Sequence, residues 1–147
     1  MTDKSLIGRS LGGGSVDVEK GRLRFFAQAT GQADPVYTEV SAARDAGHPT
    51  LPVPPTFLMC LNSEVSDLHQ TLATLKMDLG RILHAEQAFE YHRMAYAGDT
   101  LTFETKVIDV YEKKGGALQF AVNETRVTNQ KGEHVASLRG TIVQRNA

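Results

Sequence analysis

The chain of 147 residues contains no tryptophan, a single cysteine and no apolar run long enough to cross a bilayer. A lone cysteine excludes an intramolecular disulfide and any zinc site built from several thiolates. The first residues also lack the apolar segment of a secretory signal peptide. We therefore expect a cytoplasmic protein without disulfides and without a membrane span. Cys60 lies in an apolar run and is expected to be buried and inert.

The chain also lacks an excess of charge of either sign, because it has 16 basic and 17 acidic residues and a net charge of −1. No general field attracts the chain to nucleic acid or to anionic lipid, so neither is an expected partner. A hydrophobic fraction of 41% and a charged fraction of 22% are typical of globular proteins. At this length a sizeable core is possible, and we expect one domain spanning residues 1–147.

The first half of the chain has helical signals. Asp17 is a plausible N-cap for a helix that continues to Thr30 and stops at Gly31. Thr38 can cap a shorter helix that ends at Gly47. The preceding glycine run, residues 12–14, lacks the spacing of a phosphate-binding loop and is expected to form a flexible turn.

A proline-rich segment separates these helices from the next. Four prolines within seven residues, 49–55, predict an extended crossing. Pro55 can begin a buried central helix, whose apolar positions recur at helical spacing through Leu68. Residues 69–80 could extend this helix or form a loop.

The second half changes to a period of two. Leu118, Phe120 and Val122, for example, alternate with Gln119 and Asn123. Turn-like breaks between such runs predict an antiparallel meander with one face on the core, and helices followed by strands indicate an α+β fold. The expected strands cover residues 82–94, 100–113, 117–128 and 134–145.

One predicted strand carries an unusually polar set of side chains. His84 and His92 lie eight residues apart with Glu86 and Glu90 between them, which places all four on one face. A metal site is conceivable, but no further ligand spacing supports one. We expect an interface or a solvated face, and no metal.

Three sequence blocks together resemble a known family. They are Phe-Ala-Gln-Ala-Thr-Gly with Asp-Pro-Val-Tyr at 26–37, Pro-Pro-Thr-Phe at 54–57, and the run at 84–93 leading to Ala-Gly-Asp at 97–99. In this order they resemble the MaoC-like dehydratases of the N-terminal, FAS1-like dehydratase type. The resemblance implies a hot-dog fold, in which an antiparallel sheet wraps a long central helix.

The resemblance also implies a chemistry. Catalytic members add water across the double bond of a 2-enoyl-CoA or acyl-carrier-protein thioester, or catalyse the reverse dehydration, without a cofactor. An aspartate and a histidine activate the water, and backbone N–H groups at the central helix stabilise the thioester oxygen. Pro55, Thr56 and Phe57 occupy that helix start here.

The water-activating pair is replaced in this chain. Gln32 stands at the aspartate position, Asp34 at an asparagine position and Tyr37 at the histidine position. An amide and a phenol with a pKa of about 10 are poor bases near neutral pH. The family includes subunits that lack the pair and combine with a catalytic hot-dog partner, and we expect this chain to be such a half.

Some candidate site residues follow from these motifs. Asp34 and Tyr37 are the candidates for catalysis, although Asp34 beside Pro35 is also a typical turn residue. The candidates for substrate binding are Gln32, His48, Pro55, Thr56 and Phe57, and His48 could equally be an ordinary loop histidine.

Other functions remain open at this stage. A homodimeric enoyl-CoA hydratase could use Asp34, Tyr37 or His92, and a thioesterase would need a carboxylate such as Glu64 or Asp67 near the central helix. A non-enzymatic acyl-CoA binding protein is a further alternative. Each requires a homo- or heterodimer, because a lone hot-dog sheet leaves an edge unpaired.

Overall fold

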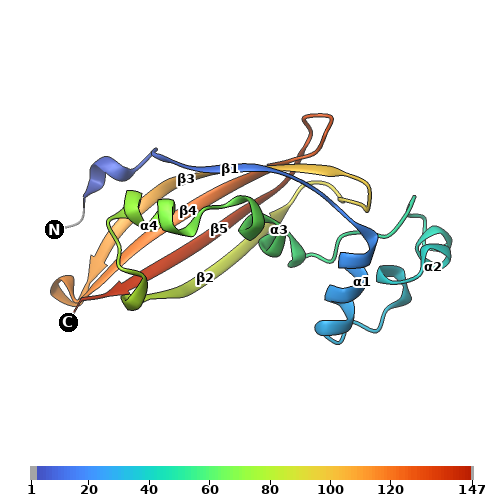
Figure 1. The fold of residues 1–147 in the computed structure, drawn as a ribbon, viewed down its shortest axis with the longest axis horizontal. Coiled ribbons are helices and arrows are strands. Elements are labelled where there is room, and N and C mark those ends of the chain that lie inside the picture. The colour runs from blue at the N-terminus through green and yellow to red at the C-terminus, as the bar shows by residue number, and fades with distance from the viewer. Residues whose placement is uncertain (1–2, 147) are drawn as a thin grey trace.

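The computed structural model describes residues 3–146, which form a five-stranded antiparallel sheet with helices on one face and at one end (Figure 1). The strands follow the order β1-β3-β4-β5-β2 across the sheet. Their bounds are Ser10–Asp17 for β1, Ile82–Tyr91 for β2, Thr100–Lys113 for β3, Leu118–Thr128 for β4 and His134–Arg145 for β5.

The helices divide into two groups. Helices α3 and α4 lie in front of the sheet in Figure 1, whereas α1 and α2 lie beyond one end of it. None of the helices within residues 3–146 is long and apolar enough to cross a membrane. Their bounds are Lys20–Ala29 for α1, Val40–Asp45 for α2, Phe57–Val65 for α3 and Leu68–Leu75 for α4.

The strand predictions for the second half are confirmed, but the pairing differs from a simple meander. Strands β3, β4 and β5 pair in sequence, whereas β2 pairs with β5 at the far edge. The segment after β2 crosses to the opposite side, where Ala95 accepts a hydrogen bond from the Val53 N–H at 2.8 Å. Gly98 and Asp99 exchange backbone bonds with Val18. These contacts with the proline-rich segment and with Val18, the residue after β1, hold the crossover.

The expectation of a flexible turn at residues 12–14 is wrong, because these glycines belong to β1. Gly13 has a φ of +153°, and a Cβ there would lie 1.9 Å from the Phe103 carbonyl oxygen. A Cβ at Gly14 would lie 3.1 Å from the Val65 Cβ of α3. The run therefore allows an edge strand to approach both β3 and α3 more closely than other residues permit.

The predicted starts of the first two helices are also displaced. Asp17 ends β1 and accepts a hydrogen bond from the Thr100 hydroxyl at 2.7 Å, so it does not cap α1. Glu19 and Glu39 occupy the N-cap positions of α1 and α2, and neither makes a side-chain capping bond. The predicted stop at Gly31 is confirmed by its φ of +70°.

The central helix is divided in two. Ser66 is extended, with φ −100° and ψ 134°, and its hydroxyl donates to the Asn62 carbonyl at 2.7 Å. Asp67 then caps α4 by accepting from the Gln70 N–H at 3.0 Å. Local side-chain bonds thus compete with a continuous helix. Cys60 of α3 is exposed, so its expected burial is wrong.

Two apolar clusters form the core. The α3 cluster joins α1, α3 and the proline-rich segment to the sheet, and the α4 cluster joins α4 and the start of β1 to the other half of the sheet. The α3 cluster includes Leu23, Leu51, Leu61, Phe103 and Leu138, and the α4 cluster includes Leu11, Leu72, Leu75, Val107 and Val110.

Candidate functional site

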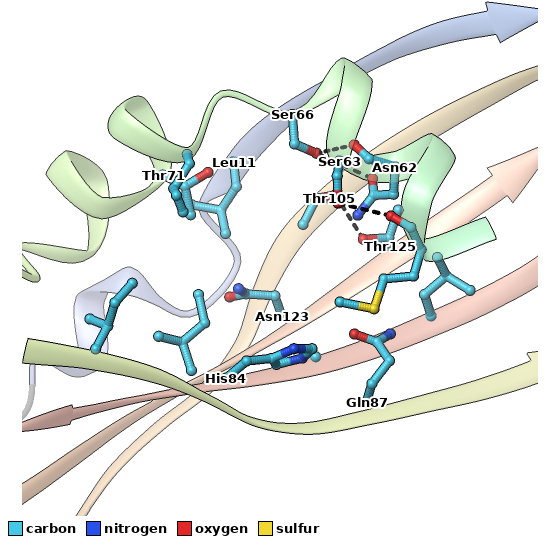
Figure 2. A pocket seen from close by; sticks show the side chains of 16 residues that line it. Leu11, Asn62, Ser63, Ser66, Thr71, His84, Gln87, Thr105, Asn123 and Thr125 are labelled. Atoms are coloured by element: carbon cyan, nitrogen blue, oxygen red, sulfur yellow. Dashed lines mark hydrogen bonds between the residues drawn. The ribbon is translucent and has the colours of Figure 1, made fainter. Parts of the chain in front are cut away.

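A cavity of about 460 Å³ lies between helices α3 and α4 and the sheet (Figure 2). Leu11 of β1 closes one side, and the floor consists of side chains from β2, β3, β4 and β5. About half of its lining residues are polar, which is unusual for the space beneath a helix. The polar lining residues are Asn62, Ser63, Ser66, Thr71, His84, Gln87, Thr105, Asn123 and Thr125.

The register of the sheet arranges the floor in rows. Gln87 of β2, Gly140 of β5 and Asn123 of β4 are cross-strand partners in one row. In the next row, Thr125 pairs with Thr105, and their hydroxyl oxygens lie 2.8 Å apart. The first row therefore presents two amides on either side of a residue without a side chain.

A bulge in β2 decides which side chains reach the cavity. The register of β2 against β5 shifts between His84 and Glu86. His84 consequently lines the cavity together with Gln87, whereas Glu86 does not line it. The expected face shared by His84, Glu86, Glu90 and His92 is therefore wrong, because the extra residue interrupts the period of two.

The polar lining is only partly visible in the sequence. Asn62 and Ser63 are adjacent on α3, and Ser66 follows directly after the helix, so the three share one side; the apolar pattern of α3 obscures this signal. The alternation within β4 predicts Asn123 opposite the apolar face, yet Asn123 points into the cavity. Which face of a strand is covered depends on the helices above it.

The predicted catalytic loop lies elsewhere, at the other end of the sheet. Asp34 is exposed, and its carboxylate accepts the Val36 N–H at 3.0 Å, which caps a short 3-10 turn over Pro35–Tyr37. The Gln32 side-chain oxygen accepts the Asp34 N–H at 3.1 Å. Both side chains therefore stabilise the turn itself.

A second cavity, of about 400 Å³, adjoins this loop. Tyr37 and Pro55 line it together with His92, whose ring lies 4.2 Å from that of His134 between centroids. Tyr91 lines the same cavity, and burial raises the pKa of its phenol. The structure thus brings together Tyr37, a candidate for catalysis, and Pro55, a candidate for substrate binding.

The remaining candidates lie outside this cavity. Phe57 is buried, and its ring centroid lies 4.9 Å from that of Phe26. Thr56 precedes α3 and is exposed. His48 is half-buried, with Nδ1 3.2 Å from the Tyr96 hydroxyl.

The carboxylates of the central helices already have partners. Glu64 of α3 forms a two-point ion pair with Arg22 of α1, and one of its contacts measures 2.8 Å. The hydrogen bond with Glu64 raises the pKa of the Arg22 guanidinium, which also lies over the Phe57 ring. Asp67 caps α4.

The chain matches one family model and is similar to a group of bacterial proteins. Residues 5–138 match the family model of the FAS1-like, dehydratase domain region. A UPF0336 protein of Streptomyces coelicolor is 33% identical over 146 residues, which cover 99% of this chain and 96% of that protein. A UPF0336 protein of Leifsonia xyli is 36% identical over 130 residues, covering 87% of this chain and 85% of that protein.

Solved structures share its fold. The C-terminally truncated HadBC (3R-hydroxyacyl-ACP dehydratase) complex of Mycobacterium tuberculosis includes a chain that is 26% identical, with a TM-score of 0.80, covering 97% of this chain and 98% of that one. The (R)-hydratase of A. caviae is 18% identical, with a TM-score of 0.72 and coverage of 95% and 98%. A MaoC-like dehydratase aligns with a TM-score of 0.83 at 22% identity; 98% of this chain matches 43% of that longer one. The predicted α+β hot-dog fold is confirmed.

Proposed function

Because the chain belongs to the FAS1-like dehydratase domain family, we propose that it is one subunit of an enoyl-thioester hydratase or 3-hydroxyacyl dehydratase. Residues 1–147 form one hot-dog domain in this proposal. The substrate is an acyl thioester of coenzyme A or of acyl-carrier protein, and no metal or organic cofactor takes part.

Within such an enzyme, this subunit shapes the acyl site and does not activate water. The observation that carries this proposal is the position and hydrogen bonding of Asp34, the one carboxylate in the motif loop. Its oxygen accepts the Val36 N–H, and its side chain is exposed and absent from the lining of the two cavities described above. The amide of Gln32 cannot act as a base, and the phenol of Tyr37 is a poor general base near neutral pH.

The proposed acyl site is the cavity beneath α3 and α4. Its volume, about 460 Å³, falls within the usual range for small-molecule sites. Apolar clusters border it on both sides, which suits an alkyl chain. We assign the thioester and the partner's catalytic groups to the second cavity, because Pro55, just before α3, and Tyr37 from the motif loop line it.

The missing aspartate and histidine would come from a second hot-dog subunit. The similar HadBC protein is itself a complex. Strand β2 is an edge of the sheet, and its side chains Glu86 and Glu90 are exposed. Symmetric antiparallel pairing of two copies through β2 would gather four carboxylates on one side of the seam, which opposes a homodimer. A partner with basic side chains on its edge strand would pair better.

Hydration of crotonyl-CoA tests the proposal. The chain purified alone should show no turnover, and a co-purified catalytic hot-dog subunit with an intact aspartate and histidine should restore it. Asp34→Asn should leave the activity of the complex within about twofold, because the carboxylate only caps a turn. If the chain alone hydrates crotonyl-CoA and Tyr37→Phe abolishes this activity, the proposal that the partner subunit activates water is contradicted.

A specific observation favours one alternative, a homodimeric hydratase with unusual catalytic groups. Tyr37 and His92 line the same cavity as Pro55, so a phenol and an imidazole are available near one helix start. This alternative predicts activity without a partner and its loss in both Tyr37→Phe and His92→Gln. A thioesterase is less well supported, because Glu64 is paired with Arg22 and Asp67 caps α4.

A further inference from the structure

Strands β1 and β2 form the two edges of the sheet, and only one of these edges is well protected (Figure 1). Strand β1 is rich in glycine, its register against β3 shifts between Ser10 and Gly12, and it packs closely against α3. Strand β2 has 10 residues, pairs regularly with β5 from Glu86 to Tyr91, and contains no glycine, proline or lysine. Edges that stay unpaired are usually short, bulged, or protected by lysine or proline. Strand β2 is therefore the edge that is open to another strand.

Large apolar side chains are exposed along the β2 edge. Leu83 is 57% exposed and Tyr91 is 46% exposed, and Met94, shortly after the strand, is 50% exposed. Apolar side chains that gather at an unpaired edge gain free energy when a partner removes them from water. The edge is thus better suited to pairing than to permanent contact with solvent.

Two glutamates of β2 lie on the face of the sheet away from the helices. Gln87 lines the cavity beneath α3 and α4, and Phe89 packs against the α3 cluster. Glu86 and Glu90 alternate with these side chains, so they lie on the opposite, outer face. Both glutamates are exposed, and the one ionic contact that either makes within residues 3–146 joins Glu90 to the His92 Nε2, at 3.9 Å.

The neighbouring arginine does not neutralise this edge. Arg139 of β5 pairs across the strands with Ala88, which lies between the two glutamates. Its side chain is exposed and forms no ion pair with either glutamate within residues 3–146. The outer side of the edge strand therefore presents two carboxylates, whereas the single guanidinium lies one strand further in.

A second copy of this chain fits the β2 edge poorly. In a symmetric antiparallel pair the twofold axis is perpendicular to the joined sheet, so the helices of both copies lie on one face. The four glutamates then gather on the other face, on either side of the seam. Like charges that face each other across a strand pair are destabilising, and opposite charges are stabilising.

We infer that Glu86 and Glu90 select the second subunit of the proposed enzyme. The β2 edge pairs with a hot-dog strand that carries lysine or arginine on its outer face, and it rejects a second copy of this chain. The inference rests on the proposed function, which requires a second subunit. Backbone hydrogen bonds and apolar contacts along the seam are available to either partner, so the charges decide between them.

Competition between like and unlike pairs tests the inference with this chain alone. Equal amounts of the wild type, labelled with ¹⁵N, and of an unlabelled Glu86→Lys, Glu90→Lys variant are mixed at low salt, and native mass spectrometry counts the pairs. Mixed pairs should exceed their statistical proportion at least about tenfold, because glutamates then face lysines across the seam. The excess should shrink in high salt, since charges at an exposed seam are screened.

A matched control places the same change of charge elsewhere on the outer face. Glu104 of β3 and Glu124 of β4 lie at least two strands from the β2 edge. Mixtures of the wild type with a Glu104→Lys, Glu124→Lys variant should stay near the statistical proportion. In a second measurement, by sedimentation equilibrium, the neutral Glu86→Gln, Glu90→Gln variant should pair with itself at least about threefold more tightly than the wild type does.

Three results would overturn the inference: statistical mixing of the wild type with the edge variant, no tighter self-pairing by the neutral variant, or no pairs of any kind. The catalytic subunit gives a further reading, because it should bind the Glu86→Lys, Glu90→Lys variant at least about tenfold more weakly than the wild type. Unchanged binding, with crotonyl-CoA hydration by the complex retained, would contradict the inference and leave the proposed function intact. Absence of hydration by the wild-type complex would overturn the proposed function and would not change the mixing result.

Discussion

Replacement of Gly13 by alanine should destabilise the protein far more than the same change one residue earlier. Gly13 has a φ of +153° in an edge strand, and a Cβ would lie 1.9 Å from the Phe103 carbonyl oxygen and 2.8 Å from its carbon. Both atoms are backbone, so no side-chain rotation relieves the clash. Strand β1 must move away from β3, which loosens the strand that carries Leu11 into the cavity wall.

The magnitude has two parts. A non-glycine residue forced into such a backbone conformation costs about 1–3 kcal/mol, and overpacking at a tight contact costs about 1–3 kcal/mol. The free energy of unfolding should therefore fall by about 2–6 kcal/mol. Gly12 has a φ of +88°, but a Cβ at this position would meet no atom within 4 Å, so Gly12→Ala should cost only the strain, about 1–2 kcal/mol.

Urea unfolding followed by far-ultraviolet circular dichroism measures both values, and it suits a chain without tryptophan. With an m-value of about 2 kcal/mol/M, the midpoint of Gly13→Ala should lie about 1–3 M below that of the wild type. Both variants need the same protein concentration, because pairing of subunits adds to the measured stability. A midpoint for Gly13→Ala no lower than that of Gly12→Ala would refute the steric argument.

Three further predictions concern a buried leucine, an ion pair and a tyrosine. Leu23 is fully buried, so Leu23→Ala should lower the free energy of unfolding by about 2–5 kcal/mol in the same urea assay. A double-mutant cycle of Arg22→Met and Glu64→Gln should give a coupling of about 1 kcal/mol that shrinks in high salt, since both side chains are partly exposed; no coupling in low salt would contradict it. Burial raises the pKa of Tyr91, so its contribution to stability is present below the ordinary tyrosine pKa of about 10 and is lost as the pH rises through the folded value. Tyrosinate absorbance should then show a late-ionising component that is missing in Tyr91→Phe.

Local patterns decided most of the secondary structure. The bounds of β3 and β5 match the predicted 100–113 and 134–145, because alternation and turn residues act between near neighbours in the chain. The stop at Gly31 follows from one residue's access to positive φ. The break between α3 and α4 also had a local signal, since Asp67 is a typical N-cap.

The cavity is much harder to predict than the elements around it. The motif loop indicates Asp34 and Tyr37, and the structure brings Tyr37 to a cavity while Asp34 caps a turn. The polar cavity depends instead on Asn123 and Gly140, which are cross-strand partners 17 positions apart in the numbering. Such a pairing depends on register, and register is a property of two strands together.

The sequence by itself determined where most of the helices and the strands β2 to β5 form and to which family the protein belongs, because propensity, periodicity and short motifs are local properties. Only the tertiary structure decided that β2 pairs with β5, that the bulge after His84 turns this side chain into the cavity, and that the glycines of β1 pack against β3 and α3. Each of these depends on the free energy of contacts between distant segments. Neither partner in such a contact specifies it alone.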